Sequence, residues 1–551
     1  MHKRSSRRRP APSRPATALV TAFVITETPM TRLLLPTRRN VLAGGGAMAA
    51  GAALGLPALA QSDRPDVTIA VQALVDNFEP IQAISNVGMR VVNAMFDTLF
   101  YRNYLGNPDG SGNQIQPAIA TGIERLDPQR VRVTIRDDVR FHDGAPVTSQ
   151  DVAFSFGEDR MFGPEPLTPR AAYFRPDLVE VTALDDRTVE FVTAAPDYAM
   201  EKRLASWIGW VVPEGPFRDM GLDGFGQAPI GTGPYKMKEF IRGDRIVLEA
   251  NDDYYRGRPT ARTITFIVVP ETATRVAGLI SGEYDFACAL SPDDLDLLAR
   301  YDDVDARGAT IENTHLIVHN QVDNILSDKR IRKAMALCVD RDTLNTALWK
   351  GKAGVTNGFQ MPSQGVAFDP NRPAYSQQIG TAKQLLSEAG YAGETITFRT
   401  LNDYYVNSVA AAQVMQQWWQ EAGLNVELVI MENWGQVTGD GLMTRNWSNG
   451  FPLPDPVAPL TTDWGPTSNV QANYGWKAPE EFNSLLDTIK TSPDGPDRTA
   501  AFQRALDIFD DEAPGFPLYR PYELYGVRAN INWRPVTFEW MDLRPNNLTF
   551  G

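Results

Sequence analysis

The sequence predicts a mixed α/β protein whose chain builds one lobe, leaves it to build a second, and then returns to the first. Residues from about 130 to 195 alternate between strand patterns and turns, whereas residues from about 311 to 505 carry helices followed directly by strands. The residues after about 506 return to strand patterns. A chain of 551 residues is also too long for one hydrophobic core, so we expect two or three domains.

The segment 37–60, TRRNVLAGGGAMAAGAALGLPALA, is predicted to be an export signal. Arg38 and Arg39 precede a weakly apolar stretch rich in Gly and Ala, and Ala58 and Ala60 form an A-x-A cleavage site. So many small residues make a poor transmembrane anchor. The pattern therefore favours a cleaved twin-arginine signal and a periplasmic location.

Removal of this signal would leave a strongly acidic protein. Met30 would begin a signal of conventional length, so residues 1–29 are either a mis-assigned start or an unusually long basic leader, and we expect Met30 to be the true start. Cleavage after Ala60 removes nine of the 53 Lys/Arg and one of the 67 Asp/Glu, leaving 44 basic and 66 acidic residues and a net charge of −22. This charge disfavours nucleic acid and anionic lipid as partners, and we expect a monomer.

The first half of the mature chain is predicted to be rich in strands. Residues 66–74 alternate as a half-buried strand does, and 91–100 place their apolar side chains on one helix face. Residues 187–194 and 244–252 are further alternating strands. Residues 263–270 form a continuous apolar run, which is typical of a strand covered on both faces.

The stretch VRVTIRDDVRFHDGAPVTSQDVAFSF, residues 131–156, predicts a strand, a turn and a capped helix. Apolar residues alternate from Val131 to Ile135, Asp143-Gly144 favours a turn, and Thr148 to Asp151 has the S/T-x-x-D form that caps a helix. His142 is the one residue that this pattern leaves unexplained. It could serve catalysis or a scaffold.

The second half contains one unit twice. Residues 381–400 and 411–431 each give a helix, then Glu-Ala-Gly, then a strand, with Gly390 and Gly423 where a helix closes in the left-handed conformation. This repeat favours an α/β layer. Residues 498–514 predict another amphipathic helix.

The only two cysteines, Cys288 and Cys338, lie in the apolar contexts YDFACAL and AMALCVD. These contexts favour two free buried thiols, although an exported protein could also pair them.

Further blocks follow one another along the chain in an order that carries a family resemblance. They are GTGPYKMKEF (231–240), NDDYYRGRP (251–259), GLISGEYDFA (278–287), SDKRIRKAMALCVDRDTL (327–344), AKQLLSEAGY (382–391) and APGFPLYRP (513–521). Together with the FHDG turn, they resemble the extracytoplasmic solute-binding proteins of the peptide/nickel/opine class, family 5, which are the capture subunits of ATP-driven importers. The resemblance covers essentially the whole mature chain.

The resemblance implies a bilobal periplasmic-binding-protein fold with two hinged lobes and an extra domain inserted in the first. We therefore expect lobe I at 61–310 with the inserted subdomain at about 106–230, lobe II at 311–505, and a return to lobe I at 506–551. The ligand would lie in the cleft, and closure would trap it. The FHDG turn would belong to the scaffold of lobe I, which makes His142 a structural residue.

The resemblance also implies the substrate-binding component of an ABC transporter. Such a protein captures a small organic solute (peptide-like, opine-like or sugar-like) and delivers it to permease and ATPase subunits, without a cofactor and without catalysis. The alternatives are a secreted hydrolase and a periplasmic sensor or chaperone. A hydrolase would need an activated nucleophile, and the sequence contains no G-x-S-x-G elbow.

His315 and His319 are four residues apart in THLIVHN, a strand-like stretch that would place both on one face. Metal ligation is conceivable, but no Cys, Asp or Glu completes a site nearby. We therefore expect a structural histidine pair whose hydrogen bonds are satisfied, and no metal site.

Residues 444–464, TRNWSNGFPLPDPVAPLTTDW, are the most informative about the ligand. In family members that bind free peptides, an acid in this segment holds the ammonium group of the peptide. The corresponding place here is Pro452 when counted from the Asp455-Pro456 pair, and Gly450 when counted from Trp447. Neither is acidic.

The dipeptide-binding members also carry an arginine that pairs with the ligand's carboxylate, and Asn402 occupies the matching place. A buried charge without a partner would cost several kcal/mol. We therefore expect that ordinary zwitterionic peptides are not the ligand.

Aromatic and amide side chains remain, and they suit flat or neutral polar ligands, sugars included. Any one of the aromatics could instead belong to a core. The predicted ligand-binding residues are Asn86, Asn402, Tyr404, Tyr405, Trp434, Trp447, Asn449, Phe451 and Asp455.

Overall fold

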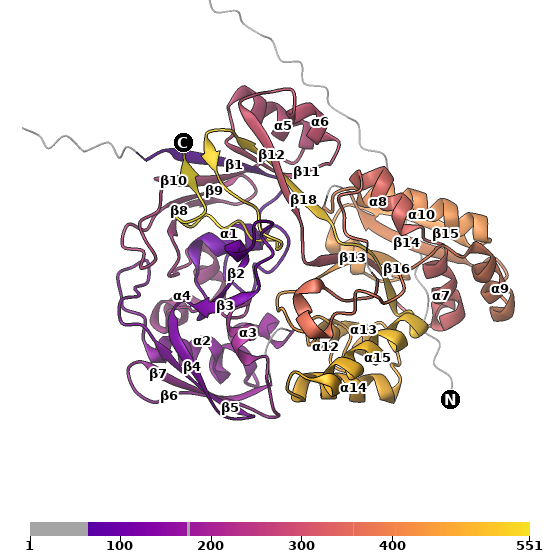
Figure 1. Cartoon of the computed structure of the whole chain (residues 1–551), viewed down its shortest axis with the longest axis horizontal. Coiled ribbons are helices and arrows are strands. Elements are labelled where there is room, and N and C mark those ends of the chain that lie inside the picture. Colours follow the sequence, from indigo (N-terminus) through magenta and orange to yellow (C-terminus); the bar gives the residue numbers. More distant parts are fainter. Residues whose placement is uncertain (1–63, 174–176, 356, 403) are drawn as a thin grey trace, which may run out of the picture. The chain divides into compact units, whose positions relative to one another are not determined.

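The structure is a computed structural model that describes residues 64–551 except 174–176, 356 and 403 (Figure 1). The predicted export signal, with Arg38, Arg39, Ala58 and Ala60, and the candidate start Met30 lie outside the described residues. Among the helices of the described part, none has the length and apolar character that crossing a bilayer requires.

Lobe I is organised by a mixed seven-stranded sheet with the strand order β12-β18-β11-β1-β10-β9-β8. The strands are β1 (Asp66–Val71), β8 (Tyr235–Ile241), β9 (Arg245–Ala250), β10 (Thr263–Val268), β11 (Phe286–Leu290), β12 (Val304–Thr310) and β18 (Tyr522–Arg528). β1 pairs in parallel with β10 and β11 at the centre. The predicted strands at 66–74, 244–252 and 263–270 are therefore confirmed.

Lobe II is organised by a five-stranded sheet with the order β15-β14-β16-β13-β17. The strands are β13 (Asn313–His319), β14 (Thr395–Leu401), β15 (Asn425–Met431), β16 (Thr444–Gly450) and β17 (Gly515–Tyr519). The predicted repeat is confirmed, because α9 (Ile379–Ala389) leads to β14, α10 (Ser408–Ala422) leads to β15, and the two strands pair in parallel. Gly390 and Gly423 close these helices with φ of 72° and 96°.

A separate four-stranded antiparallel sheet interrupts lobe I between β3 (Gln114–Pro117) and β8. Its order is β4-β5-β7-β6, with β4 (Ala120–Asp127), β5 (Arg130–Ile135), β6 (Leu178–Ala183) and β7 (Thr188–Thr193). The helices α2 (Ser149–Phe156), α3 (Met200–Leu204) and α4 (Glu214–Gln227) belong to the same stretch of chain (Figure 1). The strands of this sheet lie within residues 106–230, which we expect to form the inserted subdomain.

The FHDG turn fixes the inserted sheet to the loop before β8. The backbone N–H of Gly231 donates to Nδ1 of His142 at 3.2 Å, and Nε2 of His142 lies 3.1 Å from the carbonyl oxygen of Gly233. Burial lowers the pKa of His142 to about 4, so the ring is neutral and suits both contacts. Thr148 and Asp151 form the predicted capping box at the start of α2. His142 therefore has a structural environment.

The chain passes between the two large sheets at two places. It leaves lobe I between β12 and β13, through Glu312, and returns between β17 and β18, through Arg520. Glu312 is buried and accepts two hydrogen bonds from Arg102 of lobe I, at 2.7 and 2.6 Å. The return therefore lies later than the expected residue 506, because β17 pairs with β13 of lobe II. A helical pattern shows that 496–512 is a helix but not which sheet it covers.

The remaining elements cover these sheets or join them. Their bounds are α1 (Gly88–Met95), β2 (Phe100–Asn103), α5 (Thr272–Ser281), α6 (Asp294–Leu298), α7 (Lys329–Leu337), α8 (Arg341–Trp349), α11 (Trp434–Thr438), α12 (Leu460–Asp463), α13 (Asn469–Ala472), α14 (Glu480–Thr491), α15 (Pro496–Glu512), β19 (Ile531–Asn532) and β20 (Thr549–Phe550). Short 3-10 and π turns complete them, at Tyr104–Gly106, Glu158–Phe162, Pro169–Tyr173, Ile325–Ser327 and Pro362–Ala367.

The helix predicted over 91–100 is wrong in its second half. α1 ends at Met95, and Phe96 is already extended, with φ of −127° and ψ of 147°. Phe96 and Leu99 are still fully buried, because an extended segment can direct them into the same core. Apolar spacing alone therefore could not mark the end of this helix.

The two cysteines lie in different lobes. Cys288 is on β11, and Cys338 follows α7 at its C-cap. Both are buried and free, so the prediction of two thiols is confirmed.

Candidate functional site

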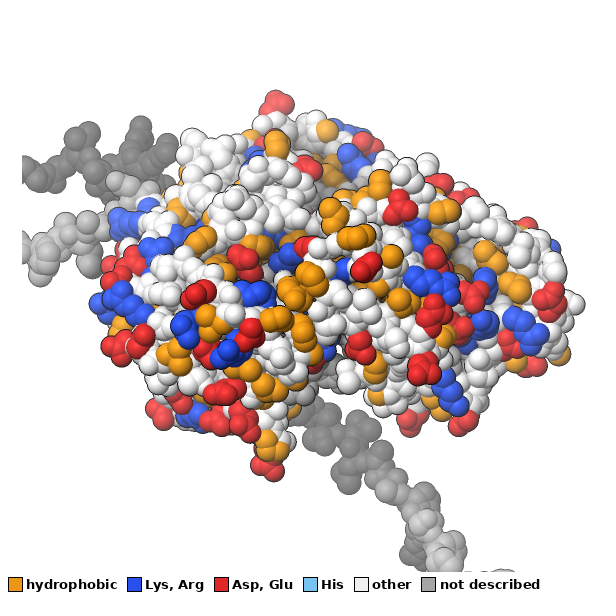
Figure 2. Space-filling view, turned by 60° about the horizontal axis from the view of Figure 1, so that its bottom comes forward, with side chains coloured by type: hydrophobic (Ala, Val, Ile, Leu, Met, Phe, Trp, Pro, Cys, Tyr) orange, Lys and Arg blue, Asp and Glu red, His pale blue; other side chains and the backbone are white. Residues whose placement is uncertain are grey.

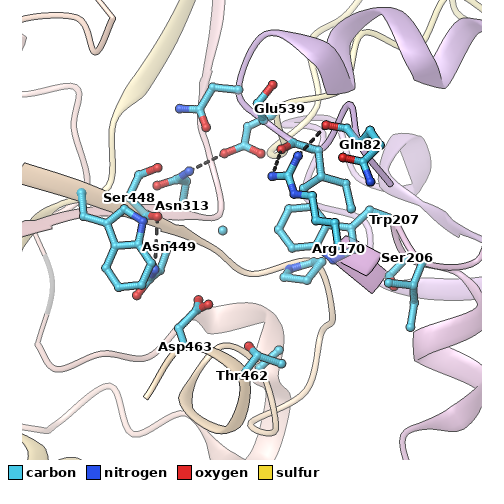
Figure 3. Close-up of a pocket in the computed structure, with 18 of the residues that line it drawn as sticks. Gln82, Arg170, Ser206, Trp207, Asn313, Ser448, Asn449, Thr462, Asp463 and Glu539 are labelled. Carbon is cyan, nitrogen blue, oxygen red and sulfur yellow. Dashed lines mark hydrogen bonds between the residues drawn. The ribbon is translucent and has the colours of Figure 1, made fainter. Parts of the chain in front are cut away.

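A cavity of about 580 Å³ is lined by residues of both lobes (Figure 3). Lobe I contributes residues of the loop between β1 and α1, the segment around Trp207, and Glu539 of the C-terminal segment. Lobe II contributes the start of β13, the loop after β14, and β16 with the residues that follow it to Asp463. This volume lies in the range that holds small-molecule ligands.

Six of the nine predicted ligand-binding residues line this cavity: Asn86, Tyr404, Tyr405, Trp434, Trp447 and Asn449. The other three lie outside the lining. Asn402 is exposed, and Phe451 is fully buried in the core of lobe II, where its ring centroid lies 5.2 Å from that of Phe359. Asp455 is fully buried and paired with basic side chains.

One wall of the cavity is an aromatic cluster from lobe II. The rings of Tyr404 and Trp434 meet edge to face, with centroids 5.0 Å apart, and Tyr404 contacts Tyr405 in the same way at 4.8 Å. Burial raises the pKa of Tyr405 to about 12, so it stays protonated and can donate a hydrogen bond. The cluster therefore offers apolar ring surface with a few hydroxyl groups.

A second aromatic wall is formed by Trp447 of β16, and the buried Trp464, which follows α12, packs against it. The Trp447 ring lies 5.8 Å from that of Trp464, and the indole N–H of Trp464 donates to Oδ1 of Asn449 at 3.0 Å. The guanidinium of Arg445 lies over the Trp447 ring, 5.1 Å from its centroid. Packing and hydrogen bonding thus hold Trp447 and Asn449 in place at the cavity surface.

Three arginines also reach the lining, each held by its own neighbours. Arg203 pairs with Asp197 at 2.8 Å, and Arg170 donates to the carbonyl oxygen of Ile84 at 2.7 Å. Arg445 contacts the hydroxyl of Tyr474 at 3.4 Å. These guanidinium groups give the cavity donors for acceptor atoms of a ligand.

Two carboxyl groups face the cavity, Asp463 from lobe II and Glu539 from lobe I (Figure 3). Burial raises the pKa of each to about 7. Asn313 donates a hydrogen bond to Oε1 of Glu539, which opposes part of that shift. Sequence reasoning missed both acids, although Asp463 lies within the segment 444–464 that it singled out.

Gly450 is one of the places where family members that bind peptides would carry an acid, and the cavity explains its small size. A Cβ at this position would lie 3.2 Å from the ring of Trp207 and 3.8 Å from Oε1 of Glu539. A carboxylate at residue 450 would therefore meet a second carboxylate. The lack of an acid at residue 450 consequently does not leave this region of the cavity without one.

The histidine pair of β13 is buried. His315 lies 4.8 Å from the Tyr405 ring, and burial lowers the pKa of His315 and of His319 to about 3. The expected satisfied pair is wrong for His319, because within the described part of the chain neither of its ring nitrogens has a hydrogen-bond partner. No cluster of three or more His, Cys, Asp or Glu among the described residues is placed to hold a metal.

Comparison with known proteins identifies the class. The model of the bacterial extracellular solute-binding proteins, family 5, matches residues 114–470. The oligopeptide-binding protein AppA of Bacillus subtilis (strain 168) is 25% identical over 455 residues, which are 76% of this chain and 80% of that protein. The dipeptide-binding protein of Escherichia coli (strain K12) is 24% identical over 432 residues, 72% of this chain and 79% of its own length.

A solved structure shows the same fold. The dipeptide-binding protein of Pseudoalteromonas sp. SM9913, in complex with Met-Leu, superposes with a TM-score of 0.78 at 20% identity, covering 88% of this chain and 100% of its own.

The chain therefore belongs to the bacterial extracellular solute-binding proteins of family 5. Its fold is the bilobal fold that the sequence predicts. Its function is solute binding for an ABC importer rather than catalysis, since the family and the relatives are named for binding.

Proposed function

We propose that the mature protein captures a small organic solute in the cavity between the lobes and delivers it to a membrane permease with its ATPases. The twin-arginine segment with Arg38 and Arg39 would direct export, cleavage after Ala60 would release the protein into the periplasm, and it would act as a monomer. The solute is peptide-like, opine-like or sugar-like.

The observation that carries this proposal is the origin of the cavity walls. Trp207 and Glu539 belong to lobe I, whereas Trp447, Asn449 and Asp463 belong to lobe II. A ligand that touches both walls gains its full set of contacts only when the lobes are closed. Its differential affinity for the closed state would drive closure, and opening would release it unchanged.

Two further observations support a small organic solute as the partner. The acidic composition disfavours nucleic acid, and on the face in Figure 2 the acidic and basic side chains are interspersed. Solved proteins of this fold were bound to the dipeptide Met-Leu and to agropinic acid, both small organic molecules.

Native mass spectrometry of protein purified from its own host, without refolding, tests this proposal. We expect one small molecule bound per monomer, released on unfolding with its mass unchanged. Small-angle scattering should then show that this molecule lowers the radius of gyration. An unchanged radius of gyration would contradict hinged capture, and chemical conversion of the molecule would revive the secreted hydrolase.

Export and delivery are tested in the host. Replacing Arg38 and Arg39 by lysine should leave the protein in the cytoplasm, and deleting the permease genes of the importer that it serves should abolish uptake of the captured molecule. Uptake that persists without a permease would favour the sensor alternative.

A further inference from the structure

The cavity holds carboxyl groups that the protein itself does not neutralise. We propose that the solute carries a protonated amine or guanidinium group, and that this group pairs with Asp463; the inference rests on the proposed function of the cavity. It names the chemistry of the ligand, which the fold alone leaves open.

Asp463 is the last residue of α12, and its carboxyl group faces the interior of the cavity (Figure 3). Within the described part of the chain, no basic side chain lies within ion-pair distance of it and no donor hydrogen-bonds to its carboxyl oxygens. Burial alone raises its pKa to about 7. A carboxyl group in such surroundings is strongly stabilised by a cation brought in with a ligand.

The opposite lobe supplies a second acid with a similar environment. Glu539 is 6% exposed and accepts a hydrogen bond from Asn313, while the nearby Arg90 forms its ion pair with Glu523 at 2.7 Å. The cavity therefore presents one carboxyl group from each lobe. A cationic ligand would be attracted by both walls, which favours the closed arrangement.

The aromatic walls suit the same chemistry. Trp207, Trp434 and Trp447 line the cavity, and indole faces attract cations more strongly than other side-chain rings do. From Trp434, Trp447 and the neighbouring aromatic and amide residues, the sequence alone led us to expect a flat or neutral polar ligand. A neutral ligand could stack on them, but it would give the buried carboxyl group of Asp463 no cation that favours its ionised form.

The arginines in the lining do not remove this argument. Arg203 is paired with Asp197, and Arg445 lies over Trp447. The third, Arg170, donates to the carbonyl oxygens of Gln82 and Ile84. Among the described residues, no arginine of the lining forms an ion pair with Asp463, so charges of both signs remain available to the ligand. We therefore expect a solute with a cationic end near Asp463 and acceptor atoms elsewhere.

Matched pairs of probes test the inference. 6-Aminohexanoate and 6-hydroxyhexanoate differ only in the charged nitrogen, and so do tyramine and tyrosol. Binding of each is measured by calorimetry and by tryptophan fluorescence for the wild type, for Asp463→Asn, and for Asp487→Asn, a control that removes an exposed acid from α14.

In the wild type and in Asp487→Asn, at least one amine should bind about tenfold more tightly than its alcohol, because charged hydrogen bonds contribute at least that much. In Asp463→Asn this preference should disappear. The inference is overturned if the preference survives in Asp463→Asn, if alcohols bind as well as amines, or if no amine binds at millimolar concentration. Should Asp463→Asn not fold, Asp463→Ser carries the same comparison.

A failure of this inference can be distinguished from a failure of the proposed function. A molecule without a basic nitrogen, found bound to the protein from its own host, would overturn the inference and leave solute capture intact. Conversion of the bound molecule would instead overturn solute capture.

Discussion

Two aspartates eight residues apart, Asp455 and Asp463, have opposite environments. Asp455 is fully buried and forms ion pairs with Arg498 at 2.6 Å and with Lys202 of lobe I at 2.7 Å. Asp463 faces the cavity and has no cation among the described residues. The first carboxylate is neutralised within the protein, whereas the second is left for a ligand. An acid near the binding segment is therefore informative only once its partners are known.

The largest effect should come from Asp455. Asp455→Asn leaves the buried guanidinium of Arg498 with a weaker partner, so the free energy of unfolding should fall by about 3 kcal/mol. Urea denaturation measures this, with Asp487→Asn as the exposed control. Near-normal stability combined with a loss of solute binding would instead make Asp455 a ligand-binding residue, as the sequence predicts.

The next effect concerns the cavity wall. Trp447→Ala should weaken solute binding by about tenfold or more, because it removes a ring from the ligand surface, while the protein stays folded. Trp418→Ala is the matched control, since Trp418 packs against the core of lobe II and is not in the cavity lining. Equal solute affinities for the two variants would place the ligand elsewhere.

A third test uses pH. The folded protein holds protons on Asp463 and Glu539 up to pH 7, whereas their ordinary pKa values are 3.8 and 4.5. Between about pH 4 and pH 7 the folded state therefore binds more protons than the unfolded state. These two groups consequently lower the free energy of unfolding as the pH rises through that range. Asp463→Asn should raise the melting temperature of the ligand-free protein at pH 8 more than at pH 4. Equal shifts at both pH values would show that Asp463 is not desolvated.

The smallest effect should come from the surface contact between the lobes. Lys490 of α14 pairs with Asp177, and Asp177 is 45% exposed. Lys490→Met should change the free energy of unfolding by less than about 1 kcal/mol. Lys202→Met should have a larger effect on closure, because its partner Asp455 is buried. Small-angle scattering measures how far the bound solute lowers the radius of gyration of each variant. An equal decrease in both variants would show that Lys202 has no role in closure.

Sequence patterns predicted much of the architecture. The α9-β14 and α10-β15 units carry local signals, namely helical periodicity and a glycine in the left-handed conformation, and both could be predicted. The return to lobe I could not be placed, because the pairing of β17 with β13 joins residues about two hundred positions apart. Such pairing leaves no trace in a local pattern.

Part of the cavity lining was predicted from segments that the family resemblance marked. Trp447, Asn449 and Tyr404 lie in segments that the resemblance marked, and they line the cavity. Trp207 and Glu539 come from the inserted region and the C-terminal segment, and only folding brings them to Gly450. Phe451, next in sequence to Gly450, comes just after the end of β16 and is buried in the core of lobe II instead.

The position of Glu539 has a consequence for biosynthesis. One carboxyl wall of the cavity is made by a segment that the ribosome adds after both large sheets have been completed. A chain that stops before residue 539 would still contain every strand of those sheets but would lack half of the acidic pair. Such a chain would also lose Met541, Leu543 and Leu548 from the core of lobe I, so the last residues to be synthesised complete both that core and the acidic pair.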